Sequence, residues 1–220
     1  MFFIGLVTLF ICSLVEVKAQ ESIQQSKFSA GADLYSNFIF RGTSYGRGPS
    51  VQPTVEYING RFTAGVWGAY DAGGYSEADP YVSFSFPSGL TLGLTDYYYP
   101  ELELFDFTRA TGSHAVEINA GFTTGSLSLS ANYILNEAGG AESAGGDMYF
   151  QAGYAFTYFS VFAGGGNGWH TSDGEFDLCN VGISTSKELK LSDSFSIPVT
   201  GQVIVNPDRE QLFVVVGFSF

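Results

Sequence analysis

Apolar side chains recur at every second position in many stretches along the chain. Clear examples run from Phe28 to Leu34, from Leu127 to Leu135 and from Leu212 to Phe220, with Ser, Thr, Gly, Asn or Gln at most intervening positions. Alternation with period two predicts β-strands that have one apolar face. After the N-terminal region, no uninterrupted apolar stretch reaches the length of about 18 residues that a transmembrane helix requires.

The breaks between these stretches alternate between short and long. The short breaks include Asn59-Gly60, 87–89 and 123–126, and the long ones are 42–50, 71–79, 100–113, 137–146 and 165–175. This alternation is typical of an antiparallel up-and-down transmembrane β-barrel, an all-β fold with tight turns at one end and longer loops at the other. We expect about twelve strands, with ten or fourteen as alternatives. The predicted strands are 27–41, 51–58, 61–70, 80–86, 90–99, 114–123, 127–136, 147–156, 159–165, 176–185, 194–205 and 211–220.

The stretch from Phe176 to Ser184 has the weakest pattern. Phe176 and Leu178 compete for the apolar face with Cys179, Val181 and Ile183. A slip of one residue in a strand moves every side chain to the opposite face, so the register here stays open.

The two ends of the chain indicate export and insertion into a membrane. Residues 1–19 are predicted to be a signal peptide cleaved near Ala19, because the apolar run from Phe2 to Val15 is too short to span a bilayer. Residues 20–26 form a short N-terminal segment and residues 27–220 the barrel. The chain ends within a predicted strand, and Phe218 and Phe220 are the candidate signal for the barrel-insertion machinery. These features predict the outer membrane of a Gram-negative bacterium.

Three segments carry a family resemblance. Residues 32–42, Ala-Asp-Leu-Tyr-Ser-Asn-Phe-Ile-Phe-Arg-Gly, are similar to the opening strand of the TorF-like family of porins, although Asn37 and Phe38 replace the usual Asp and Tyr. Residues 62–67 and Tyr97-Tyr98-Tyr99-Pro100 resemble two further segments of that family. The resemblance implies an outer-membrane barrel.

The charge of the chain limits its partners. Nine Lys and Arg residues face 22 Asp and Glu residues, which gives a net charge of −13 and argues against nucleic acid as a partner. Most of the acids fall in the predicted outer loops, where they would enrich cations. The expected partners are outer-membrane lipid, lipopolysaccharide and, through the C-terminal strand, the insertion machinery. The oligomeric state stays open.

Charged residues at the positions between the apolar ones are expected to face the lumen. The candidate pore-lining residues are Asp33, Arg41, Glu56, Arg61 and Glu117. Such residues either set the field of a constriction or pair with each other, and both readings stay open. The sequence predicts a porin or small channel for passive diffusion of small solutes with a preference for cations. The alternative is a non-conducting structural or binding barrel that acts through its acidic outer loops.

The sequence gives little support for catalysis. His170, Ser172 and Asp173 lie in one loop, but the members of a catalytic triad usually converge from separate segments. The carboxylates at 173, 175 and 177 lack the full pattern of a calcium loop. We therefore expect no enzyme activity, no metal site and no cofactor.

Overall fold

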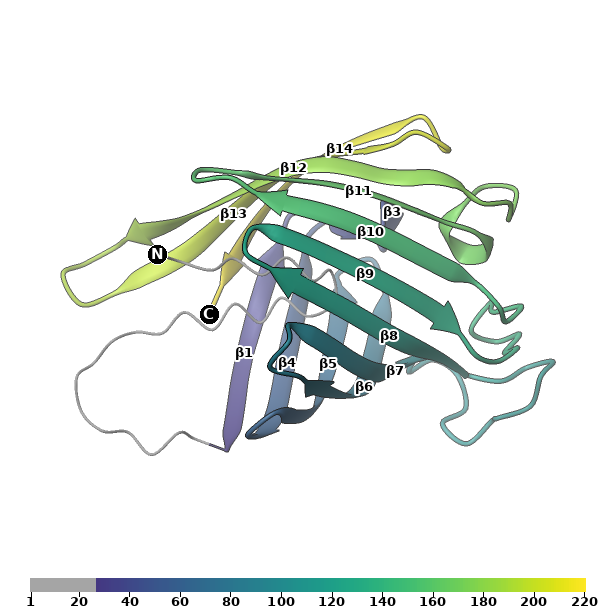
Figure 1. Cartoon of the computed structure of the whole chain (residues 1–220). Coiled ribbons are helices and arrows are strands. Elements are labelled where there is room, and N and C mark those ends of the chain that lie inside the picture. Colours follow the sequence, from purple (N-terminus) through teal and green to yellow (C-terminus); the bar gives the residue numbers. More distant parts are fainter. Residues whose placement is uncertain (1–26) are drawn as a thin grey trace.

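The computed structural model describes residues 27–220, so the predicted signal peptide and the predicted N-terminal segment both lie outside it. The described chain forms a closed antiparallel barrel in which each wall strand pairs with the next one along the chain, and the last strand pairs with the first (Figure 1). The wall contains twelve strands, which confirms the predicted fold class and number. Within the described part, no helix is long and apolar enough to cross a membrane.

The strand bounds are close to the predicted ones, apart from two regions described below and from β12, which continues to Lys190 where the prediction ended at residue 185. The wall consists of β1 (Phe28–Tyr35), β4 (Ser50–Asn59), β5 (Phe62–Asp71), β6 (Ser76–Ser85), β7 (Leu90–Tyr98), β8 (His114–Thr124), β9 (Leu127–Ile134), β10 (Met148–Ala155), β11 (Ser160–Gly166), β12 (Asp177–Lys190), β13 (Ser196–Asn206) and β14 (Gln211–Ser219). Two short strands, β2 (Phe38–Phe40) and β3 (Thr43–Tyr45), form a separate sheet. A single 3-10 turn, η1 (Gly168–His170), follows β11.

The outer surface of the wall is apolar. Along β14, for example, Leu212, Val214, Val216 and Phe218 are exposed, and Gly217 and Val215 between them are buried. A surface of this kind is costly in water and fits the hydrocarbon core of a bilayer, where a closed barrel leaves no unpaired strand edge. The alternation in sequence therefore separates a lipid-facing side from an inner side.

A β-bulge explains the ambiguous pattern in β12. Gly164 of β11 pairs with Asn180 and Gly165 pairs with Leu178, so Cys179 is an extra residue in β12. Phe176 and Leu178 before the bulge and Ile183 after it are all exposed on the outer surface, whereas Cys179 is fully buried. The even-numbered residues before the bulge and Ile183 after it thus face outward, because the bulge shifts the register between them.

The first strand is shorter than predicted. The wall strand ends at Tyr35, and residues 36–49 fold into the barrel as a hairpin that contains β2 and β3. Phe38 and Phe40 continue the even-numbered phase of β1, so the sequence alone does not separate them from the wall. Their rings lie inside instead, where Phe38 packs 5.4 Å from Trp67 and Phe40 packs 5.8 Å from Tyr97, measured between ring centroids. We call residues 36–49 the inner hairpin.

The fourth wall strand, β6, starts earlier than predicted. Residues 71–79 were expected to form a loop and the strand to begin at Pro80, but β6 begins at Ser76 and Pro80 pairs with Val66 in mid-strand. Proline lacks a backbone donor and is uncommon inside a strand. Because the strand starts at Ser76, Glu77 and Asp79 belong to the wall and are buried.

The barrel closes between the first and last strands. Asp33, Leu34 and Tyr35 pair with Ser219, Phe218 and Gly217, and Phe220 exchanges two backbone hydrogen bonds with Ala32. The Ser36 amide also donates to the Val216 carbonyl at 2.8 Å. The C-terminal strand is therefore part of the seam that closes the wall.

Candidate functional site

The inner hairpin turns at two residues, Arg41 and Gly42. Phe40 and Thr43 are paired across this turn, and both central residues have positive φ, 49° for Arg41 and 83° for Gly42. Two positive φ angles define a type I′ turn, whose twist suits a tight β-hairpin. Arginine rarely adopts this conformation, so the surrounding contacts must hold it.

Arg41 reaches from the turn to the opposite wall. Its Nη1 and Nη2 atoms donate to the two carboxylate oxygens of Glu117 on β8 at 2.7 and 2.8 Å. The guanidinium also lies 4.7 Å from the ring centre of Phe40 and 4.5 Å from that of Tyr149. Both charged side chains are about 1% exposed. A bidentate salt bridge of this kind, with the guanidinium stacked on aromatic rings, fixes the position of the hairpin tip.

Further polar groups surround the Glu117 carboxylate. Tyr97 donates its hydroxyl to Oε1 at 3.0 Å, and the Asn119 amide donates to the same oxygen at 2.5 Å. Asn119 in turn donates to Asn132 at 3.1 Å. Because these residues come from β7, β8 and β9, the network ties the hairpin to three neighbouring wall strands.

His170 also contacts the Arg41 guanidinium. Its Nε2 atom lies 3.3 Å from Nη1 of Arg41. Burial and the positive charge of Arg41 hold the pKa of His170 well below its usual range. The ring is therefore neutral near pH 7 and can accept a hydrogen bond from Arg41 through Nε2.

Two backbone contacts hold the turn against the wall. The Asn206 side chain, which is fully buried, donates to the Gly42 carbonyl at 3.0 Å. Gly42 also lies against the bulge in β12, where a Cβ atom would come within 1.9 Å of the Cys179 carbonyl oxygen. Only glycine fits this position, since it needs both a positive φ and close contact with another backbone.

Replacing Gly42 with alanine is expected to lower the free energy of unfolding by about 1–3 kcal/mol more than the matched change Gly48→Ala. Both glycines have positive φ, but nothing lies within 4 Å of a Cβ atom built at Gly48. Urea unfolding of the two variants in detergent micelles measures the difference. Equal losses would show that Gly42 is not packed against the wall.

The structure brings four of the five predicted pore-lining residues to the inner side of the barrel. Asp33, Arg41 and Glu56 border one internal cavity, and Glu117 binds Arg41 beside it. Arg41 is at the tip of the inner hairpin and not in a wall strand. Arg61 is exposed in the turn between β4 and β5, away from this group.

Two internal acids were not predicted. Glu77 and Asp79 on β6 line the same cavity as Asp33 and Glu56, although their sequence positions indicated an outer loop. Some of the acidic residues predicted to lie in the outer loops are therefore inside the barrel. Ala78, Pro80, Val82 and Phe84 do continue one alternating phase, and reading that phase through Pro80 would have placed both acids inward.

Tyr97 belongs to an internal aromatic cluster. It is only 2% exposed and packs inside with Ile134, Ala138 and Ala141. Together with nearby Trp169, this cluster fills the loop end of the interior beside the hairpin. The interior is thus narrowed by aromatic side chains as well as by the hairpin.

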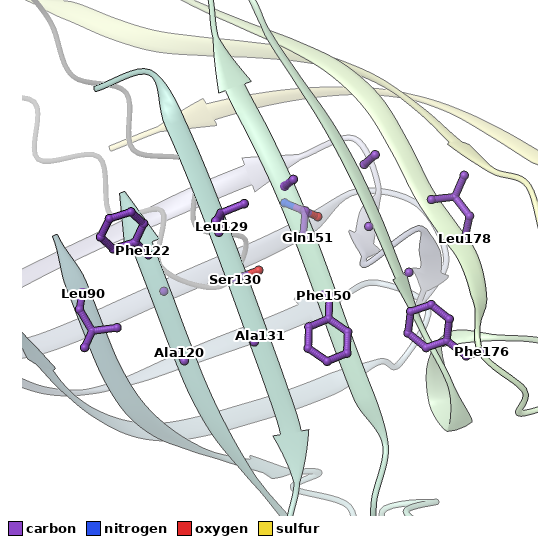
Figure 2. A pocket seen from close by; sticks show the side chains of 15 residues that line it. Leu90, Ala120, Phe122, Leu129, Ser130, Ala131, Phe150, Gln151, Phe176 and Leu178 are labelled. Carbon is purple, nitrogen blue, oxygen red and sulfur yellow. The ribbon is translucent and has the colours of Figure 1, made fainter. Parts of the chain in front are cut away.

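A groove on the outer wall has a different character. Figure 2 shows Ala120 and Ala131 between the larger side chains of Phe122 and Leu129 and those of Phe150 and Phe176. The groove has a volume of about 590 Å³, and no charged side chain lines it. It lies on the lipid-facing surface and is mostly apolar, with Ser130 and Gln151 as its polar lining residues.

The residues considered for catalysis or metal binding do not converge. The Ser172 hydroxyl donates to Asp208 at 2.8 Å, whereas His170 faces Arg41. Asp173 accepts a hydrogen bond from the Glu175 amide. Across residues 27–220, no three His, Cys, Asp or Glu side chains are grouped to hold a metal ion.

Residues 19–188 match the Gcw_chp family, described as bacterial protein of unknown function. The chain belongs to the Gcw_chp family. No curated protein matches it significantly. The more specific resemblance of this Gcw_chp protein to TorF-like porins remains a prediction.

Two solved porin structures are similar to this Gcw_chp chain. A mutant of the Rh. blastica porin has 14% sequence identity and a TM-score of 0.41, with 78% of this chain and 55% of the porin covered. OccK5 of Pseudomonas aeruginosa has 11% identity and a TM-score of 0.38, with 88% and 66% covered. The chain thus spans little more than half of the first porin. Likeness at this level says nothing about activity.

Proposed function

We propose that the protein is an outer-membrane channel for small solutes, that it prefers cations, and that the inner hairpin forms its constriction. The observation that carries the proposal is the distribution of charge inside the barrel. Four carboxylates line the internal cavity, those of Asp33, Glu56, Glu77 and Asp79. The one basic residue lining it, Arg41, is paired with Glu117. A low-dielectric passage lined by more acidic than basic side chains favours cations over anions.

The apolar outer surface supports the membrane location within this proposal. The lipid and lipopolysaccharide contacts expected from the sequence are part of the same proposal, with Phe218 and Phe220 as the proposed insertion signal. Both side chains are accessible on the outside of the closing strand, where Phe220 is 61% exposed.

Planar-bilayer recordings across a KCl gradient test the proposal. We expect a reversal potential that indicates cation preference, and a smaller preference when Glu56→Gln and Asp79→Asn are combined. The loop variant Asp173→Asn is the matched control, since its carboxylate lies on an exposed loop. A preference for chloride, or an unchanged potential in the double variant, would contradict the proposed role of the internal acids.

A non-conducting binding barrel is the second candidate, and the packing of Tyr97, Ile134 and Trp169 at the loop end favours it. The same recordings separate the two functions. If protein shown to be folded by its heat-modifiable gel migration gives no conductance, the binding barrel is preferred.

A further inference from the structure

The internal cavity combines acidic and aromatic groups. It lies between the inner hairpin and the wall and has a volume of about 130 Å³. This is the space taken by about four water molecules in the liquid. The aromatic residues lining it come from the hairpin and from four wall strands: Tyr35, Phe38, Phe40, Trp67, Tyr81 and Tyr97.

Asp79 is the carboxylate without a hydrogen-bond partner in this cavity. The side chain is completely buried, and neither of its oxygens accepts a hydrogen bond within the described structure. The Tyr98 backbone amide lies close to the carboxylate and stabilises its charged form, but it does not reach full hydrogen-bond geometry with either oxygen. By contrast, Glu56 accepts from the Tyr81 hydroxyl, and Glu77 accepts from that of Tyr75 at 2.7 Å.

A buried carboxylate without a partner is unfavourable, and a bound cation would offset that cost. Arg41 does not pair with Asp79, because both of its terminal nitrogens donate to Glu117. Among residues 27–220, no Lys, Arg or His forms an ion pair with Asp79. The open oxygens can therefore accept a positively charged donor from outside the chain.

The composition of the cavity favours an organic cation over a metal ion. No group of three suitable ligands is present in the described chain. Aromatic rings attract ammonium groups through their faces and pack against alkyl carbons. A primary ammonium group also has three N–H donors for the open oxygens of Asp79, which a quaternary ammonium group lacks.

We propose that this cavity binds a small primary alkylammonium compound, with its N–H groups on Asp79 and its alkyl part against the aromatic side chains. The site rests on the proposed function, since it names the class of cation that enters the barrel. Binding can nevertheless be measured in micelles whether or not the protein conducts.

Isothermal titration of the full folded protein with ethylammonium chloride tests the site. We expect saturable binding by the unaltered protein, binding weaker by at least about tenfold for Asp79→Asn, and unchanged binding for Asp173→Asn. Trp67 lies in the cavity wall, so binding should also alter tryptophan fluorescence.

Competition on the unaltered protein tests the site without any variant. Neither KCl nor tetramethylammonium chloride at equal concentration should displace ethylammonium. Absence of saturable binding, equal binding by folded Asp79→Asn, or equal displacement by potassium or tetramethylammonium would each overturn the proposal. Binding without conductance would contradict the channel and leave the site standing, whereas conductance without binding would do the reverse.

Discussion

Removing the inner hairpin is expected to raise the single-channel conductance severalfold. Tyr35 and Ser50 are directly paired across β1 and β4, so replacing residues 36–49 with Asn-Gly would join them by a two-residue turn. The variant lacks Phe38, Phe40 and Arg41, which occupy the interior, and it keeps every wall strand. Planar-bilayer recording measures the change, after heat-modifiable migration has shown that the variant is folded.

A second loop provides a matched control. Tyr98 and His114 are also directly paired, so residues 99–113 can be replaced by the same Asn-Gly turn. That loop contributes the Leu104 carbonyl and the Phe107 ring to His114, and no residue from 100 to 113 lines the internal cavity. Its removal should change conductance far less. Equal effects of the two deletions would show that the hairpin is not the constriction.

The second large effect concerns the buried ion pair. Either Arg41→Ala or Glu117→Ala is expected to lower the free energy of unfolding by about 3–5 kcal/mol, because each leaves an opposite charge buried without its partner. The two side chains are about 1% exposed, so solvent cannot replace the lost contact. Urea unfolding in micelles measures the loss.

The combined variant Arg41→Met with Glu117→Leu is the informative control. Removing both charges together should recover much of the stability lost in either single variant, since well-packed apolar side chains often replace a buried pair without loss. Losses below about 1 kcal/mol in both single variants would be typical of an exposed pair and would contradict the assigned burial.

The wall of the barrel was predictable because one physical rule applies along its whole length. Every strand must present apolar side chains to lipid at alternate positions, and the tight turns between strands carry their own residue signals. The bulge at Cys179 left a trace in the sequence as two competing apolar phases. Only the paired strands show that the bulge shifts the register between them.

The interior was harder to predict because its contacts join distant segments. Phe38 and Phe40 have the same spacing as the lipid-facing residues of β1, yet they pack against Trp67 and Tyr97. Alternation shows that the two faces of a strand differ in polarity. It does not show whether the apolar face lies against lipid or inside the barrel. Glu77 and Asp79 were missed for a similar reason, since they lie in the stretch 71–79 that was assigned to a loop although the alternating phase continues through it.

The position of Arg41 has a consequence for the order of folding. Its partners Glu117 and His170 lie 76 and 129 residues further along the chain. Contacts of such long sequence separation form slowly, because the intervening chain must be ordered first. The hairpin tip therefore reaches its final position only after β8 and the segment following β11 are in place. Assembly of the wall and filling of its interior are accordingly expected to be separate kinetic events, with the second one reported by Trp169 beside the tip.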